Sequence, residues 1–366
     1  MKIGIDGRLW YETGVGRYIR ALILELVQID SHHQYVLFVP SRAVNDIKSR
    51  SNLDIVACDV RWHTFDEQIR MPSIYRKYKI DLLHVPYFSV PVFIHIPLVV
   101  TLHDLTISHF ATGRATTRAL PVYLLKRIAY EWVIRIAVKK ARQIITVSHA
   151  VEKQILDSYP DTHKKLHVIY ESGELEVPTQ KVTVKTPSQY LLYVGNAHPH
   201  KNLERLVDAF KLVVKSNPNL KLVLIGKKDF FYKRLEEKLL QKELISSVYI
   251  VGEVSNNELS AWYQNARAFI FPSLSEGFGI PGLEAMGYDC PVLASDCDVF
   301  REIYHDAAAY FDPSNEQAIA KTIREAVTND RMVNRLKEAG KRVFAQYSWK
   351  KMARETLSVY ERCITI

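Results

Sequence analysis

A glycine-rich segment in the second half of the chain carries the two carboxylates best placed to do chemistry. Glu276 lies in a loop that follows an apolar strand pattern, and Pro281 suits the first turn of the helix that carries Glu284. We expect the two carboxylates to enter one crevice at different heights, where one faces a sugar and the other a ribose. Carboxylates that are solvated or cap their own helix are the alternative. Backbone amides that could meet a phosphate here are those of Gly277, Phe278, Gly279 and Ile280.

A lysine in the same half stands just before a helix. The strand pattern of residues 190–194 ends at Gly195 and Asn196, and Lys201 precedes an amphipathic pattern. An ammonium group beside free helix N–H groups is suited to clamp a diphosphate. A solvated surface lysine is the alternative.

Glycines also follow the first strand of the chain. Gly14 and Gly16 would let backbone amides approach a phosphate or a sugar at the start of a helix near Arg17, whose guanidinium adds positive charge. A tight turn is the alternative. A dinucleotide-dependent oxidoreductase would need a third glycine where the chain has Ile19, which counts against that class.

Polar residues close two further strands of the first half. His103 and Asp104 follow residues 98–102, which places an imidazole at the carboxyl edge of the predicted sheet, where loops carry function. A hydrogen-bonded structural histidine is the alternative. Ser148 follows residues 144–147 and is interpreted as the N-cap of a helix over residues 150–159.

Metal chemistry receives little support from the sequence. Asp296 and Asp298 form an Asp-x-Asp pattern, but no acidic or histidine cluster lies near them, so a loop or a helix cap is the interpretation and no metal site is proposed. The four cysteines show neither a Cys-x-x-Cys pair nor a metal-ligand rhythm, which favours a reduced, cytoplasmic setting. They are Cys58, Cys290, Cys297 and Cys363.

One basic stretch interrupts the first half. Aromatic residues are interleaved with its cations, and a basic amphipathic helix of this kind can lie on an anionic membrane surface. A helix that packs on the sheet with solvated charges is the alternative, and nucleic acid is not expected because no reader motif is present. The single acid is Glu131, and the cations are Arg114, Arg118, Lys126, Arg127, Arg135, Lys139, Lys140 and Arg142.

These residues must be positioned by two α/β domains. The chain has 366 residues, 48% of them hydrophobic and 24% charged, which excludes intrinsic disorder and fits two globular cores. Its net charge of +9 attracts anions generally. Strand and helix patterns alternate from residue 2 and restart near 188, so we predict domains over 1–175 and 189–345, a linker over 176–188, and a helix over 346–366 that packs back on the first domain.

In sequence order, these segments resemble the family-4 group of retaining GT-B glycosyltransferases over nearly the whole chain. The glutamate pair separated by seven residues and preceded by Phe-Pro-Ser is that group's best-known signature. The segments that carry the resemblance are residues 14–18, His103-Asp104, residues 146–148, residues 193–195 with Lys201-Asn202, residues 271–284, and Glu302 before Phe311-Asp312-Pro313.

The resemblance implies two Rossmann-like doubly wound domains facing a central cleft. It implies transfer of a sugar from a nucleotide-diphosphate donor with retention at the anomeric carbon and without an essential metal or other cofactor. Lys201 is similar to the diphosphate lysine, Glu276 to the carboxylate near the donor sugar, Glu284 to the ribose-binding one, and His103 to the histidine that contacts the donor sugar. Gly16 matches the loop near the phosphates, and Gly14, Arg17 and Asp104 are placed on the acceptor side.

The motifs resemble those of bacterial O-antigen-type mannosyltransferases, so GDP-mannose is the first expected donor and a UDP-hexose the second. The expected acceptor is a growing surface polysaccharide or a lipid-linked saccharide, and the expected location is the cytoplasm, including the inner membrane face. Many members carry an arginine where this chain has Asn196 or His200. Without that arginine, we expect Lys201, helix amides and either His200 or Arg205 to bind the diphosphate. A catalytically idle scaffold of the same fold is the remaining alternative.

Overall fold

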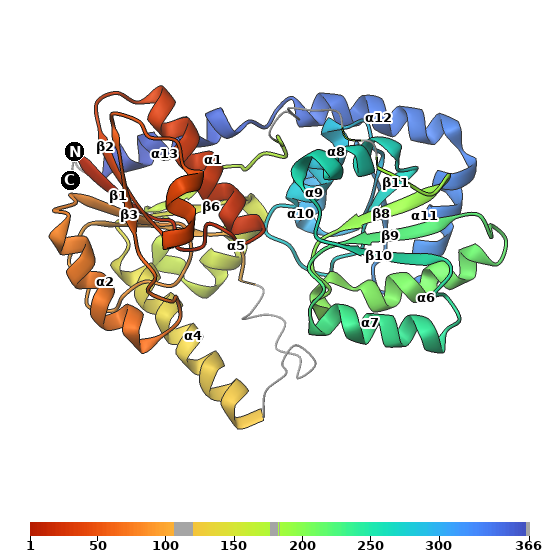
Figure 1. Cartoon of the computed structure of the whole chain (residues 1–366), viewed down its shortest axis with the longest axis horizontal. Coiled ribbons are helices and arrows are strands. Elements are labelled where there is room, and N and C mark those ends of the chain that lie inside the picture. The colour runs from red at the N-terminus through yellow and green to blue at the C-terminus, as the bar shows by residue number, and fades with distance from the viewer. Residues whose placement is uncertain (106–119, 176–181, 183, 364–366) are drawn as a thin grey trace. The chain divides into compact units, whose positions relative to one another are not determined.

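A computed structural model describes residues 1–105, 120–175, 182 and 184–363 of the chain (Figure 1). The chain divides into two compact units. The first comprises Met1–Glu171 and Ser348–Ile366, and the second comprises Ser172–Tyr347. The predicted linker over 176–188 therefore lies within the second unit, and its residues 176–181 and 183 lie outside the described residues.

The first unit is built on a parallel sheet with the strand order β3-β2-β1-β4-β5-β6-β7. Its central strands are buried and largely apolar because helices cover both faces of a parallel sheet. In β2, for example, residues 35–39 have no exposed surface. The strands are β1 (Lys2–Asp6), β2 (Gln34–Val39), β3 (Leu53–Ala57), β4 (Leu82–Val85), β5 (Leu98–Leu102), β6 (Gln143–Thr146) and β7 (Leu166–Val168).

The helices of this unit begin and end close to the predicted positions. Ser148 caps α5, since its hydroxyl accepts a hydrogen bond from the amide of Val151 at 3.2 Å, as the sequence predicts. Helix α1 begins at Gly14, three residues before the predicted start near Arg17. The helices are α1 (Gly14–Ile29), α2 (Phe65–Lys77), α4 (Leu120–Lys140), α5 (His149–Ser158) and α13 (Trp349–Arg362), with 3₁₀ turns at Ser41–Asp46 and Pro160–Thr162.

Helix α13 returns to the first unit and packs beside α1 (Figure 1). The hydroxyl of Tyr360 on α13 lies 2.6 Å from Nδ1 of His84 on β4, and both side chains are fully buried. The other ring nitrogen of His84 lies 2.8 Å from Oγ1 of Thr101. The crossing at Tyr347–Ser348 falls just after the predicted domain end at residue 345.

The second unit repeats the same architecture with the strand order β10-β9-β8-β11-β12-β13, again all parallel. Its strands are β8 (Tyr190–Val194), β9 (Lys221–Ile225), β10 (Val248–Gly252), β11 (Ala268–Phe271), β12 (Val292–Ser295) and β13 (Ala308–Phe311). Its helices are α6 (Leu203–Val214), α7 (Phe230–Gln241), α8 (Asn256–Asn265), α9 (Ile280–Gly287), α10 (Asp298–Tyr304), α11 (Glu316–Thr328) and α12 (Asp330–Phe344), with a 3₁₀ turn at Pro199–Lys201.

Each sheet has a point where the strand order reverses, and loops leaving the two strands there diverge. Ligands of doubly wound sheets bind at such switch points, beyond the carboxyl ends of the strands. In the first unit the reversal lies between β1 and β4, and in the second between β8 and β11. Within the part of the chain that the structure describes, no helix has the length and apolar character needed to cross a bilayer.

Candidate functional site

The loops that leave β8 and β11 bring together the two residues expected to act on the donor. The ammonium of Lys201 lies 2.6 Å from Oε1 of Glu276, and the two side chains are 15% and 12% exposed. The ammonium also lies 5.9 Å from the ring centroid of Phe271, the last residue of β11. A cation and a carboxylate thus meet at the switch point of the second sheet, with some surface still open to solvent.

Asn202 links the Lys201 loop to two other loops through its side chain. Its backbone is left-handed, with φ of 61°, between the 3₁₀ turn and α6. Its side-chain amide donates to the carbonyls of Pro272 at 3.1 Å and Pro313 at 2.8 Å, which lie on two other loops. The amide of Leu274 adds a 2.7 Å hydrogen bond to the carbonyl of His200. Hydrogen bonds from the Asn202 side chain and from the Leu274 amide therefore fix the position of Lys201 next to Glu276.

Arg205 also serves this loop junction. Its guanidinium donates to the side-chain oxygen of Asn202 at 3.3 Å and to the carbonyl of Pro313 at 3.2 Å. The ring of His200 stacks on His198 with centroids 5.9 Å apart. Arg205 thus supports the loop that presents Lys201, and its role as a further diphosphate ligand stays a prediction.

The glycine-rich loop ends at the first turn of α9. Gly279 has a φ of +101°, and a Cβ there would lie 2.3 Å from the hydroxyl of Tyr304, so a larger residue fits neither the backbone nor the space. That hydroxyl donates to the carbonyl of Gly279 at 2.5 Å. In this first turn Pro281 has no N–H and the amide of Gly282 donates to the carbonyl of Gly279 at 3.1 Å. The backbone amide of Ile280 is therefore the group of this turn suited to meet a phosphate, and that role stays a prediction.

The other predicted loop residues take different roles. The side chain of Phe278 is buried and packs edge-on against Tyr347, with ring centroids 5.6 Å apart, so only its backbone is suited to meet a ligand. Gly277 lies between Glu276 and Phe278 and is partly exposed. The loop therefore combines a side-chain anchor with an accessible backbone.

Glu284 lies inside α9 and is 1% exposed. Its Oε2 accepts a 2.8 Å hydrogen bond from the hydroxyl of Tyr263 on α8. Glu276 and Glu284 thus have different partners and different exposure, which is consistent with separate tasks. A shared crevice for the two carboxylates stays a prediction.

Gly195 and Asn196 form a tight turn after β8. Gly195 has a φ of +151°, and its carbonyl accepts a 2.8 Å hydrogen bond from the hydroxyl of Tyr232. The carbonyl of Asn196 accepts from the hydroxyl of Tyr193 at 2.7 Å, and its side-chain oxygen accepts from the amide of His198 at 3.2 Å. These contacts shape the entry to the Lys201 loop.

In the first unit, His103 lies directly after β5, as predicted. Its Nδ1 is 3.0 Å from Oε1 of Glu171 and its Nε2 is 3.1 Å from the carbonyl of Pro86. Burial acts to lower the pKa of His103, but the hydrogen bond and the charge of Glu171 raise it above its usual value. Both ring nitrogens thus face oxygens that can accept hydrogen bonds, an arrangement that favours the doubly protonated, cationic ring.

The ring of His103 also contacts Tyr18 on α1 edge-on, with centroids 4.9 Å apart. Gly16 precedes that tyrosine, and a Cβ there would lie 2.6 Å from the carbonyl of Trp10 and 2.7 Å from that of Leu9. Gly16 therefore has a packing role at the start of α1. Gly14 is exposed, with open space around it, and Arg17 and Asp104 are half-buried.

In the Asp-x-Asp pattern, Asp296 forms an ion pair with Arg301. Asp296 accepts two hydrogen bonds from Arg301, at 2.7 and 2.9 Å, and Asp298 lies in the first turn of α10. This agrees with the predicted loop, whereas neither aspartate caps α10, whose N-cap is Cys297 without a side-chain hydrogen bond. Among the described residues, no group of three or more histidine, cysteine, aspartate or glutamate side chains is arranged to hold a metal ion.

Two family models match the chain, one for each half. The model described as "Glycosyltransferase Family 4" matches residues 13–172, and that described as "Glycosyl transferases group 1" matches residues 178–343. The chain belongs to the family-4 glycosyltransferases. Its two parallel-sheet units have the GT-B fold, because a sucrose-phosphate synthase from Thermosynechococcus elongatus superposes on 100% of this chain and 99% of its own with a TM-score of 0.79, at 19% identity.

Curated relatives of this glycosyltransferase include two O-antigen chain mannosyltransferases. RfbU of Salmonella typhimurium is 33% identical over 204 residues, a match that spans 56% of this chain and 56% of RfbU. O-antigen chain mannosyltransferase B of Escherichia coli is 25% identical over 381 aligned residues, covering 95% of this chain and 96% of its own length.

Sequence reasoning missed several residues that position the site of this glycosyltransferase. The sequence does not mark Glu171, although it is the partner of His103 across 68 positions. Tyr263 and Tyr304 hold Glu284 and Gly279 from other helices. Short-range patterns contain no signal for such contacts. The left-handed Asn202 is the exception, since asparagine beside a helix start is a recognisable turn residue.

Proposed function

We propose that this glycosyltransferase moves a hexose, with mannose as the first choice, from a nucleotide-diphosphate sugar to a saccharide or lipid-linked saccharide in surface polysaccharide synthesis. The likeness to two O-antigen mannosyltransferases supports the sugar and the pathway class. GDP-mannose is the first proposed donor and a UDP-hexose the second. Transfer is proposed to retain the anomeric configuration and to need no metal.

The Lys201–Glu276 pair carries this proposal. A donor diphosphate brings two or more negative charges to the switch point, and it competes with one carboxylate for the ammonium. Once Lys201 turns to the diphosphate, Glu276 is released toward the donor sugar, and the backbone amides of Gly279 and Ile280 receive the remaining phosphate oxygens. Charge that builds on the leaving diphosphate is then stabilised by donors that are already in place.

The cationic His103 belongs to the same proposal. Both of its ring nitrogens are engaged, so it acts on a donor sugar through its positive charge and its backbone and does not accept a proton. The departing phosphate then takes the acceptor's proton, and no protein base is required. A nucleophilic Glu276 is the competing route.

A panel of nucleotide sugars tests the proposal. Nucleotide release is measured with and without an acceptor extract, and the product anomer is determined by NMR. Release from GDP-mannose that rises with acceptor, survives EDTA and gives an α-linked product from the α-linked donor supports the proposal. The absence of turnover with every donor would instead support a catalytically idle scaffold, and a β-linked product would overturn retention.

Peripheral membrane contact is part of the proposal and is supported by α4. Ile128 and Trp132 are 64% and 56% exposed, and they share a helix face with the exposed Arg135 and Lys139 at i, i+4, i+7 and i+11 spacing. An apolar stretch followed by cations on one face suits the surface of an anionic bilayer. Flotation with phosphatidylglycerol vesicles tests it: salt-sensitive binding that Trp132→Ala weakens is expected, and equal recovery with neutral vesicles would refute it.

A further inference from the structure

Two histidine rings occupy successive layers of the first sheet, and the proposed function uses only the outer one. His84 lies on β4 and is followed two positions later by Pro86. Thr101 lies on β5 and is followed two positions later by His103. Residues two apart in a strand face the same side of the sheet, and β4 pairs with β5 in parallel. His84 therefore lies one layer deeper than His103, below the same face.

A line of buried hydrogen bonds crosses the inner layer. Nδ1 of His84 lies 2.6 Å from the hydroxyl of Tyr360 on α13, and Nε2 lies 2.8 Å from Oγ1 of Thr101. The same Oγ1 lies 3.2 Å from the hydroxyl of Tyr18 on α1. All four residues are 0% exposed. The line thus joins α13 to α1 through two neighbouring strands.

The two histidine rings differ in charge because their partners differ. His84 faces two hydroxyls, which can each donate or accept, so a neutral ring with one proton satisfies both. Burial, together with the nearby charge of His103, lowers the pKa of His84 to about 3. His103 instead faces the carboxylate of Glu171 and the carbonyl of Pro86. The positive charge therefore belongs to the outer ring, and the inner ring supports it as a neutral group.

The side chain of Tyr18 joins the two layers. Its ring meets both histidines edge-on, with centroids 6.5 Å from that of His84 and 4.9 Å from that of His103. Its hydroxyl is held by Thr101, which is held in turn by His84. Loss of these hydrogen bonds would leave the tyrosine ring held by packing alone. The surface against which His103 rests therefore depends on the inner layer.

We propose that His84 is a positioning residue for His103. Its hydrogen bond to Thr101 fixes Tyr18, and Tyr18 fixes the ring of His103. Tyr360 is the support that α13 supplies to His84. This inference rests on the proposed function, in which His103 acts on the donor sugar, and it gives the C-terminal helix a part in that reaction.

Anchoring of α13 is the competing explanation, in which His84 holds the helix and has no effect on His103. The two explanations depend on different ring nitrogens of His84. Anchoring needs Nδ1, which faces Tyr360, whereas positioning needs Nε2, which faces Thr101. Amide side chains separate the two, because the amide of asparagine is as many bonds from Cβ as Nδ1 is, and the amide of glutamine is as many as Nε2 is.

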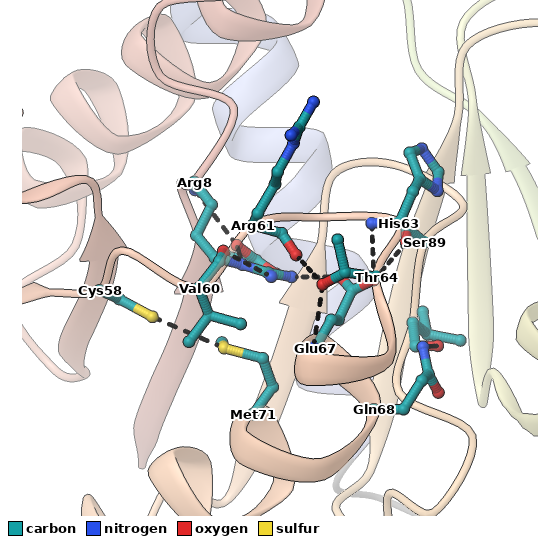
Figure 2. A network of polar contacts seen from close by, with 12 residues as sticks. Arg8, Cys58, Val60, Arg61, His63, Thr64, Glu67, Gln68, Met71 and Ser89 are labelled. Atoms are coloured by element: carbon teal, nitrogen blue, oxygen red, sulfur yellow. Dashed lines mark hydrogen bonds and ion pairs between the residues drawn. The ribbon is translucent and has the colours of Figure 1, made fainter.

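A second buried network of the same unit provides a control. The guanidinium of Arg8 lies 2.6 Å from both Oδ2 of Asp6 and Oε1 of Glu67, and Figure 2 shows Arg8 reaching Glu67. Tyr75 is fully buried, and its hydroxyl donates to Asp6 at 2.9 Å. Tyr75→Phe therefore removes one buried tyrosine hydroxyl, as Tyr360→Phe does, but in a network separate from the two histidines.

Titration of His103 in the full chain, without any donor, provides the first test. Its ring resonances, assigned with His103→Gln, are followed by ¹³C NMR against pH. The pKa of His103 is expected to fall in Thr101→Val and in His84→Asn, because the ring turns away from Glu171, and to stay near the wild-type value in His84→Gln. An unchanged pKa of His103 in Thr101→Val, or a fall in His84→Gln as large as in His84→Asn, would overturn the proposal.

Turnover separates this inference from the proposed function. Thr101→Val should lower kcat by about 10-fold, the size of one lost hydrogen bond, while the nucleotide Kd stays within about 2-fold. Tyr360→Phe should lower kcat less, and Tyr75→Phe should lower only the Tm. If Thr101→Val does not fold, the same measurements on Tyr18→Phe, which keeps the ring, decide the question. An unchanged kcat overturns the inference alone, whereas a wild type without turnover on any donor overturns the proposed function.

Discussion

The two switch points of this glycosyltransferase hold their charges in opposite ways. Between β8 and β11, one ammonium faces one carboxylate, and both side chains keep some exposure, at 15% and 12%. Between β1 and β4, one guanidinium is shared by two carboxylates, and the three side chains are no more than 5% exposed. A partly exposed pair contributes little stability and is easily exchanged, whereas breaking a buried one leaves an uncompensated charge.

This contrast indicates which unit is built to exchange ions. The pair in the second unit can give its cation to an incoming diphosphate. The cluster in the first unit is buried, and its charged groups are paired with one another. We therefore assign ion exchange to the second unit and a structural role to the ion cluster of the first.

The largest expected effect comes from removing the exchangeable cation. Lys201→Met should lower kcat with the preferred donor by about 10²- to 10³-fold, the usual cost of losing one preorganised donor to developing charge. Lys341→Met is the matched control, because Lys341 also pairs with carboxylates in the second unit but is 51% exposed on another face. A Lys201→Met enzyme with the kcat of the wild type would show that Lys201 does not stabilise the leaving diphosphate.

A smaller loss is expected at the buried carboxylate of α9. Glu284→Gln should raise the nucleotide Kd measured by calorimetry by roughly 10- to 100-fold, because it replaces a charge-assisted hydrogen bond to the proposed ribose. Tyr263→Phe removes only the 2.8 Å hydrogen bond to Glu284 and should weaken binding less. Equal nucleotide affinity in Glu284→Gln and the wild type would separate Glu284 from the donor.

The ion pair between His103 and Glu171 in the first unit should make the free energy of unfolding depend on pH. Burial lowers the pKa of His103 but Glu171 raises it further, so the folded-state pKa lies above the ordinary value of about 6.5. The stabilisation is therefore complete below that ordinary value and is lost as pH rises through the folded-state pKa. Glu171→Gln should cost about 1–3 kcal/mol of unfolding free energy at pH 6 and less at pH 9.

NMR titration of His103 checks the same prediction directly. The ring should titrate above its ordinary pKa in the wild type and at a lower pKa in Glu171→Gln, where only the charge of Asp104 and the Pro86 carbonyl still oppose burial. His149→Gln, at a histidine that pairs with Glu152 but is 64% exposed, serves as the comparison for stability. A cost in Glu171→Gln that grows toward alkaline pH would contradict a cationic His103.

The smallest effect is expected at the Asp-x-Asp pattern. Asp296→Asn should change kcat by less than about 2-fold with or without added Mn²⁺, because surface ion pairs such as Asp296–Arg301 contribute little. Turnover assays with EDTA and with Mn²⁺ provide the measurement. A strong, metal-dependent loss in Asp296→Asn would restore the metal-binding interpretation.

The sequence predicted the fold class, the placement of His103 after β5 and of Lys201 in the loop after β8, and the cap at Ser148, because these depend on local hydrophobic period and turn chemistry. It did not predict the partners. Glu171 reaches His103, and Glu67 reaches Arg8 from 59 positions away, through sheet order that no local pattern encodes. The proximity of Lys201 to Glu276 likewise follows from the pairing of β8 with β11, whose paired residues Leu191 and Ala268 are 77 positions apart.

Nucleotide binding to Glu276→Gln tests the exchange of Lys201 most directly. Calorimetry with GDP and UDP is run on the wild type, Glu276→Gln and Lys201→Met. If the diphosphate displaces Glu276 from the ammonium, Glu276→Gln binds nucleotide as tightly as the wild type or up to about 5-fold more tightly, because a partly exposed competitor has been neutralised. Lys201→Met binds more weakly. A Glu276→Gln protein that loses as much nucleotide affinity as Lys201→Met would contradict the account.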